Sequence, residues 1–394
     1  MFGEIQSQLS QWLRRWERRY LHADYAENQL RHDWLGSGQG PDTGPRTIRY
    51  SIFPKPEGIR SLLVFKPDDI GDMVHALPAL QALREALPHA RITVLCQSVV
   101  SGLVRRTHLA DEVFEVNSRS VLRRFRTVSP VPAAKFDAAV FLRTHPSYFS
   151  SFRKVHSPVL IHPLDPRMPS KSAFQVWTGD WGERGEHQTR QMLRLVEPLT
   201  GRTDETRYPK LEWTAEDNKQ CQDLLGPEID KPYLVVHPFS KDETRQYPWA
   251  YWSDLLVRIR QVHTGGIYVI GGATDLRENW GSLGVVNLAG KLSLCSTGYL
   301  LTRARAFVGV LSGPAHLAAA VGVPTAVLWG GASYPREWSP LGNVLNLQVD
   351  VPCGPCNLRT CPGFGLKCLT ELTPARVWAD LREFLAVCLR SSNQ

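Results

Sequence analysis

The segment 312–316 (SGPAH) has the residue types of an anion-binding site. It follows the apolar stretch 306–310, which predicts a buried strand, and small residues at helical spacing continue after it. Proline suits the first turn of a helix, because the N–H that it lacks would have no partner there. The unpaired N–H groups and the helix dipole attract anions at such an end, and the side chains of Ser312 and His316 add two donors. We therefore predict that Ser312, Gly313 and His316 bind a phosphate.

The loop 66–72 places several carboxylates between a predicted strand and a predicted helix. Gly71 permits a tight turn and the close approach of a ligand. Asp72 has two interpretations: it caps the helix, which aspartate does well, or it is a general base that takes a proton from an acceptor hydroxyl. Asp68 and Asp69 are rival carboxylates in the same loop.

Two charged residues in the second half of the chain also follow predicted strands. Arg245 is either a solvated loop cation or a phosphate ligand, since a guanidinium matches phosphate oxygens. Asp275 is either a turn residue or an acceptor for ribose hydroxyls. The second half has no Asp-x-Asp pair for a divalent metal, so we expect Arg245 and helix N-termini to neutralise a diphosphate without Mg²⁺.

The elements that position these residues alternate between short apolar strands and amphipathic helices. The alternation starts at residue 59, stops at the polar stretch 201–208, and restarts at residue 233. Such alternation predicts parallel sheets covered on both faces, here two doubly wound halves with a cleft between them. Ligands of such sheets bind beyond the carboxyl ends of the strands. The predicted strands are 61–65, 91–96, 112–116, 136–142, 159–162, 233–237, 266–270, 306–310 and 325–329, and the predicted helices include 72–87, 187–199 and 249–262.

Composition and charge limit the class of protein. The 394 residues are 43% hydrophobic and 21% charged, which is typical of globular domains. No apolar run is long enough to span a bilayer and no signal peptide opens the chain, so we expect a cytoplasmic protein. The net charge of +8 favours acidic partners such as nucleotides, phosphorylated sugars or anionic lipid. Nucleic acid is disfavoured, because no basic stripe is interleaved with aromatic residues.

Four of the eight cysteines lie within sixteen residues of a loop rich in proline and glycine. Four thiolates at this spacing suit a tetrahedral structural site for zinc or iron. Disulfides are the competing interpretation, which a reducing compartment disfavours. The predicted metal ligands are Cys353, Cys356, Cys361 and Cys368.

Residues 1–20 have an apolar stripe at helical spacing with arginines close by. The stripe, which contains Trp12 and Trp16, packs either on the protein itself or a partner, or on an anionic membrane surface. Residues 36–46 have the composition of a flexible linker.

Three blocks of the sequence resemble the signature blocks of glycosyltransferase family 9, the ADP-heptose:lipopolysaccharide heptosyltransferases. The blocks are 69–80 (DIGDMVHALPAL), 288–291 (LAGK) and 312–319 (SGPAHLAA), and the similarity extends from about residue 59 to 390. The resemblance implies an α/β protein with the GT-B fold, in which two Rossmann-like domains face a cleft. It also implies an inverting transfer of heptose from ADP-heptose to a sugar hydroxyl, with no cofactor required for catalysis.

The resemblance assigns roles to individual residues. It makes Asp72 the catalytic base and Ser240 a phosphate-contacting hydroxyl. Arg245 stands where members usually have a phosphate-binding lysine, and Asp275 lies near the acid that binds ribose. Leu311 departs from the pattern, because members usually have aspartate there and leucine makes no hydrogen bonds to a donor sugar.

The sequence leaves three functional hypotheses, and the chain divides into four predicted parts. The first is a heptosyltransferase that extends the lipopolysaccharide inner core, at the inner membrane surface if residues 1–20 bind lipid. The second has a protein acceptor, since autotransporter heptosyltransferases bind iron through a similar cysteine finger. The third is a non-catalytic scaffold, suggested by Leu311. The predicted parts are an extension and linker (1–57), an acceptor domain (58–205), a nucleotide-sugar domain with the cysteine loop 353–368 (206–373), and a C-terminal helix (374–394).

Overall fold

The computed structural model describes most of the chain after residue 57. The described residues are 58–116, 135–143, 155, 157, 159–163, 174–177 (backbone only), 186–201, 206–275, 280 and 283–390. The predicted N-terminal extension, 1–57, lies outside them. No helix among the described residues has the length and apolar character needed to cross a bilayer.

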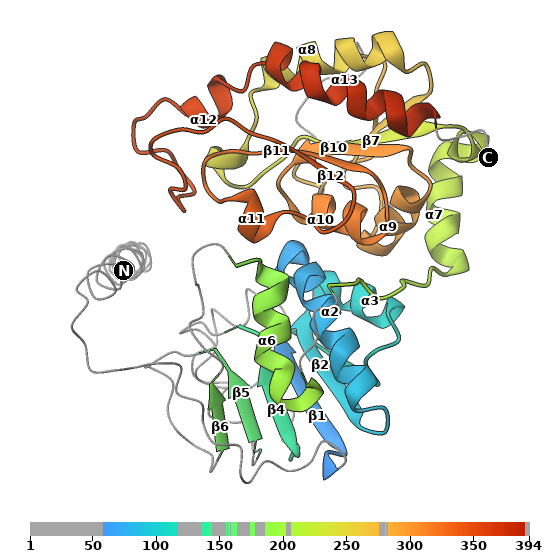
Figure 1. The fold of residues 1–394 in the computed structure, drawn as a ribbon. Helices are drawn as coiled ribbons and strands as arrows, with labels where there is room; N and C mark the ends of the chain where they lie inside the picture. Colours follow the sequence, from blue (N-terminus) through green and yellow to red (C-terminus); the bar gives the residue numbers. More distant parts are fainter. Residues whose placement is uncertain are drawn as a thin grey trace, which may run out of the picture. The chain divides into compact units, whose positions relative to one another are not determined.

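The first half contains a six-stranded sheet in the order β3-β2-β1-β4-β5-β6, and every neighbouring pair is parallel (Figure 1). The chain therefore reverses its direction of winding between β1 and β4, which lie side by side at the centre. The strands are β1 (Ser61–Lys66), β2 (Arg91–Gln97), β3 (Glu112–Val116), β4 (Ala138–Phe141), β5 (Val159–His162) and β6 (Phe174–Trp177).

The second half repeats this topology in a sheet of order β12-β11-β10-β7-β8-β9, again parallel throughout. Its reversal point lies between β7 and β10. Ligands of doubly wound sheets bind at the reversal point, so the loops after β1, β4, β7 and β10 are the expected site. The strands are β7 (Tyr233–His237), β8 (Gly266–Val269), β9 (Val286–Asn287), β10 (Ala306–Val310), β11 (Thr325–Leu328) and β12 (Val344–Leu347).

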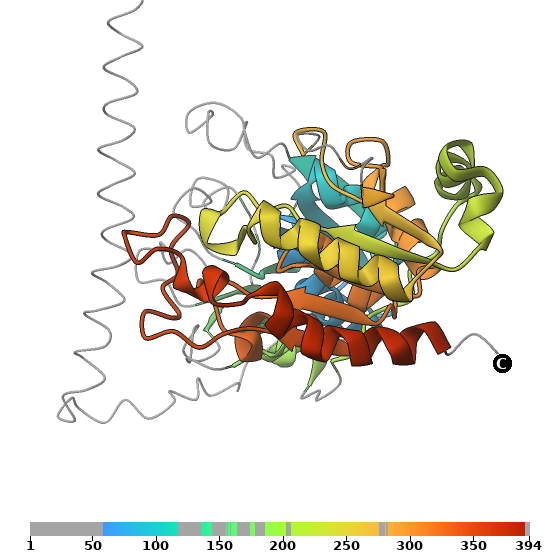
Figure 2. The ribbon, with the colours of Figure 1, turned by 90° about the horizontal axis from the view of Figure 1, so that it is seen from above.

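Helices cover both sheets. Figure 2 shows that α8 and α13 run side by side, and Figure 1 places both on one face of the second sheet. Apolar residues of α13 share a core cluster with Leu234 of β7, so this C-terminal helix packs as part of the second half. The helices are α2 (Ile70–Ala86), α3 (Ser98–Arg106), α6 (Gln188–Thr200), α7 (Ala215–Leu225), α8 (Trp249–Val262), α9 (Leu294–Thr302), α10 (Gly313–Ala320), α11 (Pro335–Trp338), α12 (Lys367–Thr370) and α13 (Pro374–Arg390), with 3₁₀ turns η3 (Gly226–Asp230) and η4 (Glu243–Arg245).

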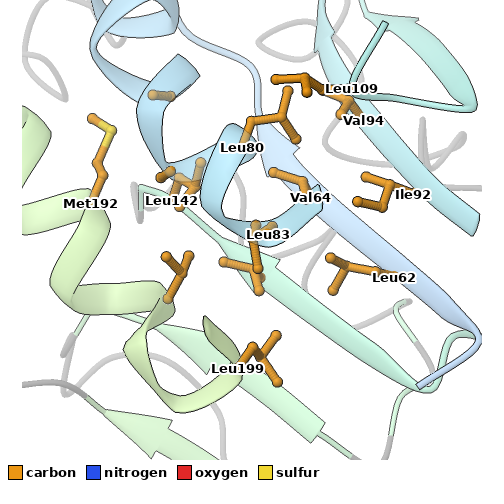
Figure 3. Packing of buried hydrophobic residues seen from close by; sticks show 14 of the residues in the cluster. Leu62, Val64, Leu80, Leu83, Ile92, Val94, Leu109, Leu142, Met192 and Leu199 are labelled. Atoms are coloured by element: carbon orange, nitrogen blue, oxygen red, sulfur yellow. The ribbon is translucent and has the colours of Figure 1, made fainter. Parts of the chain in front are cut away.

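Strand β1 explains why the first sheet forms where it does. Its continuous apolar run is buried on both faces, as expected for a central parallel strand. Leu62 and Val64 pack with Leu83 of α2 on one face (Figure 3), and Leu63 and Phe65 belong to the cluster on the other face. This two-sided burial fixes the end of β1, and with it the loop that carries the acidic residues.

The nine predicted strands agree with observed strands to within one or two residues, but β6, β9 and β12 were not predicted and some helices differ. The helix predicted from residue 72 begins at Ile70 and continues through Pro78, so Asp72 lies inside its first turn. The prediction omitted α3, α7 and α9, because polar residues interrupt their short apolar faces. Part of the predicted linker 201–208 lies outside the described residues.

Candidate active site

The N-terminal ends of α2 and α10 meet at two glycines. A Cβ added to Gly71 would lie 2.9 Å from Cδ2 of His316 and 3.7 Å from the Cα of Gly313. A Cβ added to Gly313 would lie 2.7 Å from the Cβ of Ile70. Neither approach leaves room for a side chain, so the glycines let a helix end of the first half contact a helix end of the second. The loop with the predicted base and the predicted phosphate site are therefore neighbours.

The start of α10 has buried polar atoms without partners. Oγ of Ser312, Nδ1 of His316 and Nε of Arg245 are buried and have no hydrogen-bond partner among the described residues. Burial lowers the pKa of His316 to about 3, with further lowering by the charges of His187 and Arg245. A buried donor without a partner is costly, and native proteins retain such groups where a ligand satisfies them. Together with the free N–H groups of α10, these atoms suit an anion.

Close backbone packing fixes Arg245 near this site. Arg245 ends η4, and a Cβ on Gly330 would lie 1.7 Å from the carbonyl oxygen of Thr244. Gly330 follows the end of β11 by two residues, and only glycine lets the chain after this strand support the loop. Nη1 of Arg245 lies 3.8 Å from a carboxylate oxygen of Asp242, a loose pairing that leaves the guanidinium available to a ligand.

The structure gives Ser240 and Asp275 local roles as well. Oγ of Ser240 accepts a hydrogen bond from the N–H of Asp242 (3.1 Å), which leaves its own hydrogen to donate. Oδ2 of Asp275 accepts from the N–H of Gly272 (2.7 Å), so this carboxylate stabilises the turn after β8. Asp275 therefore acts as a turn residue through Oδ2, and the contact between Asp275 and ribose stays a prediction.

Asp72 does not cap its helix. The N-cap of α2 is Asp69, and no side chain makes a capping hydrogen bond there. Oδ1 of Asp72 instead lies 3.2 Å from Nη1 of Arg143, and about a fifth of the Asp72 side chain is exposed (21%). Burial raises the pKa of Asp72, and the positive charges of Lys66 and Arg143 oppose this rise. Asp72 is thus a carboxylate of increased basicity beside the start of α10, as a general base requires.

The rival carboxylates differ in their surroundings. Asp68 is buried, and its Oδ2 accepts from Nζ of Lys66 at 2.8 Å, whereas Asp69 is exposed. Lys66 and Arg143 were missed by the sequence analysis as members of the site. Lys66 is the last residue of β1, and Arg143 follows β4 by two residues. These positions could have identified both residues as members of the site, since β1 and β4 adjoin at the reversal point.

The four loop cysteines lie close enough to affect the pKa of Cys368, but within the described residues they do not form a metal site. Burial raises the pKa of Cys368, and the thiols of Cys353, Cys356 and Cys361 raise it further. All four are free thiols, so the structure contains no disulfide among them. However, no three potential ligands within the described residues are arranged to hold a metal ion. The predicted tetrahedral site is therefore not preformed in this arrangement of the loop.

Leu311 lies in an apolar environment. It directly follows β10, is 5% exposed, and belongs to the buried cluster that includes Phe307 and Trp329. Its side chain contributes to the core of the second half, and it offers no hydrogen bond to a ligand.

Two doubly wound halves, each with its loops at a reversal point, define the GT-B class of glycosyltransferases. The family model described as "Glycosyltransferase family 9 (heptosyltransferase)" matches residues 165–365, and the chain belongs to this family of transferases. The predicted GT-B fold and the resemblance to family 9 are confirmed.

Named proteins of the family resemble most of the chain. Lipopolysaccharide heptosyltransferase 1 of Pseudomonas aeruginosa is 26% identical over 360 residues, which cover 82% of this chain and 98% of that protein. The crystal structure of a family 9 glycosyltransferase from Veillonella parvula has a TM-score of 0.69 at 18% identity, covering 85% of this chain and 99% of that one. The dodecameric iron-containing heptosyltransferase TibC of enterotoxigenic E. coli, solved with ADP-D-beta-D-heptose, has a TM-score of 0.53 at 15% identity, covering 86% and 81%.

Proposed function

We propose that this protein transfers heptose from ADP-heptose to a hydroxyl of the lipopolysaccharide inner core, with inversion at the anomeric carbon. One observation carries the proposal: Gly71, which precedes the carboxylate of Asp72, packs against the anion-binding end of α10 at Gly313. The name of the P. aeruginosa relative supports the choice of acceptor, and the ligand of the TibC structure supports the choice of donor.

The proposed reaction uses one group from each half. The diphosphate of the donor occupies the end of α10, where Ser312, His316 and Arg245 have buried donors without partners. Asp72 takes the proton of the acceptor hydroxyl as the oxygen attacks the anomeric carbon from the face opposite the diphosphate. The bond from the anomeric carbon to the diphosphate breaks, and ADP leaves. Arg245 and the N–H groups of α10 stabilise the charge that develops on ADP, so the transfer needs no cofactor.

The experiment measures ADP release and heptosylated product with purified protein, ADP-heptose and an inner-core acceptor. Asp72→Asn should lower kcat by about 10²- to 10⁴-fold, the usual contribution of a general base. Asp69→Asn is the matched control, because this exposed carboxylate is in the same loop. Full activity of Asp72→Asn would refute the assignment of the base, and an inactive wild-type protein would favour the scaffold hypothesis.

The cysteine loop supports a second proposal, a structural zinc or iron ion bound by Cys353, Cys356, Cys361 and Cys368. Two of the cysteines pack on the same residue: the N–H of Cys356 donates to the carbonyl of Gly331 (2.9 Å), and a Cβ added to Gly331 would lie 3.3 Å from Sγ of Cys368. Elemental analysis of purified protein should find about one metal ion per chain, lost in a Cys353→Ser/Cys356→Ser double variant and retained in Cys295→Ser. Metal-free wild-type protein would refute this proposal.

The acceptor and the membrane contact are tested in the same preparation. A protein acceptor is the alternative that the cysteine loop favours, because the resemblance associates such a loop with heptosyltransferases that modify proteins. If heptose appears on protein serines but not on the inner-core acceptor, the alternative replaces the first proposal. The membrane proposal concerns residues 1–20, whose deletion should abolish sedimentation with anionic vesicles.

A further inference from the structure

The central strands of the first sheet bring two basic residues to the acidic loop. Lys66 is the last residue of β1, and Arg143 follows β4 by two residues. β1 and β4 are paired in parallel, with Phe65 beside Phe141, so the chain leaves both strands at the same edge of the sheet. Lys66 is 1% exposed, which is rare for a lysine and requires a charged partner.

Four charged groups form a chain of contacts from this edge to the start of α2. Nζ of Lys66 donates to Oδ2 of Asp68 at 2.8 Å. Nη1 of Arg143 lies 3.2 Å from Oδ1 of Asp68 and 3.2 Å from Oδ1 of Asp72. A single guanidinium nitrogen thus bridges the two carboxylates. Gln97 at the end of β2 also holds the loop, because its Nε2 donates to the carbonyl of Pro67 (2.9 Å).

We propose that Arg143 is a positioning residue that orients the Asp72 carboxylate and keeps it ionised, while the buried Lys66–Asp68 pair holds Arg143 in place. The proposal rests on the proposed function, because it assigns to Asp72 the role of the base. Arg143 acts through Asp72 and not on the transferred sugar.

The charges around Asp72 determine the direction in which the loss of Arg143 shifts the pKa of Asp72. Burial raises the pKa of Asp72, and the positive charges of Lys66 and Arg143 lower it. The negative charges of Asp68 and Asp69 raise it. The imidazoles of His75 on α2, His187 before α6 and His316 on α10 have lowered pKa values, so they add no positive charge here at neutral pH. Removing Arg143 therefore leaves burial less opposed, and Asp72 becomes protonated at a higher pH.

The experiment is the pH dependence of kcat/KM for heptose transfer. Arg143→Gln should move the acid limb of the profile toward alkaline pH by about one unit, a typical effect of losing a cation beside a carboxylate. Arg143→Lys keeps a cation and should restore most of the wild-type profile. Arg91→Gln, an exposed arginine of β2, is the control and should leave the profile unchanged.

Two outcomes overturn the proposal. An unshifted acid limb in Arg143→Gln, with folded protein by circular dichroism, excludes an effect on Asp72. A raised KM for the acceptor with unchanged kcat and profile instead makes Arg143 a substrate ligand. Failure of the proposed function is recognised separately, because the wild-type protein would then transfer no heptose. Failure of the base assignment alone would leave Asp72→Asn active, whatever the behaviour of Arg143.

Discussion

The imidazole rings of His75 and His316 lie edge to face with their centroids 4.3 Å apart, although His75 belongs to α2 and His316 to α10. His187 adds a third ring, 5.2 Å from that of His75, and its Nε2 donates to the carbonyl of Ser339 (2.7 Å). Nδ1 of His75 is 3.0 Å from Oγ1 of Thr189. Three neutral imidazoles thus join helices of both halves beside the predicted site.

This histidine cluster should make stability depend on pH. Burial lowers the pKa of His316 to about 3, and burial together with the other imidazoles lowers the pKa of His75. Both residues gain a proton on unfolding at acid pH, so their contribution is present above pH 6.5 and is lost as pH falls below it. From pH 7.5 to 5.5 the free energy of unfolding should fall by about 1.4 kcal/mol for each. Urea unfolding at the two pH values measures this.

A variant separates the cluster from other titrating groups. His316→Gln should reduce the loss of unfolding free energy by the share of one histidine, whereas the same change at exposed His89 should leave it unaltered. Equal pH dependence in His316→Gln and the wild type would contradict the prediction.

The glycine contact between α2 and α10 should tolerate no added carbon. Gly313→Ala places a Cβ 2.7 Å from the Cβ of Ile70. Because the backbone fixes the position of a Cβ atom, no side-chain rotation relieves this contact and the helix ends must separate. Overpacking of this kind costs about 1–3 kcal/mol. We expect the free energy of unfolding to fall by this amount and kcat/KM to fall as well. Urea unfolding and initial rates measure the two effects. Gly58→Ala is the control, because a Cβ there meets nothing within 4 Å; equal effects of both changes would argue against the contact.

A buried ion pair joins the two halves at a second place. Nε and Nη2 of Arg106 in α3 lie 2.8 and 3.1 Å from the two carboxylate oxygens of Asp217 in α7. Asp217 is 4% exposed by side chain and also completes a capping box with Thr214. Arg106→Ala leaves this carboxylate short of a charged donor and should cost about 1.5–3 kcal/mol of unfolding free energy.

Chemical denaturation with a matched exposed pair tests this difference. Arg91→Ala breaks the pair with Glu112, whose side chains are 67% and 39% exposed, and should cost less than about 1 kcal/mol. A cost of Arg106→Ala as small as that of Arg91→Ala would show that the buried pair does not stabilise the contact between halves.

Periodicity predicted the central strands because each is a short apolar run buried on both faces, as β1 and β10 are, but it missed β6, β9 and β12. It missed α7 because that helix buries few residues, although the capping box of Thr214 and Asp217 was a local signal for its start. The predicted site residues of α10 lie together because one turn carries Ser312 and His316. The contribution of Arg143 depends on strand order, which the local pattern does not contain.

The spacing of the cysteines in the loop 353–368 suggested a metal site, but it did not specify how the loop packs. The spacing is compatible with a metal site, yet Cys356 is held by a hydrogen bond from its N–H to the carbonyl of Gly331 (2.9 Å), and Cys368 is buried in α12. These backbone constraints arise from the packing of the loop on the end of β11, which spacing alone does not specify.

Arg245 should contribute to the affinity for the donor diphosphate as well as to the stabilisation of the leaving ADP. Its buried Nε has no partner among the described residues, so a bound phosphate oxygen would gain a charge-assisted hydrogen bond there. Arg245→Ala should weaken ADP binding by about 10- to 100-fold, from the loss of about 1.5–3 kcal/mol. Arg245→Lys keeps the charge and should lose less. Isothermal titration with ADP measures both, with Arg258→Ala on α8, a partly exposed arginine, as the control. Unchanged affinity in Arg245→Ala would place the diphosphate elsewhere.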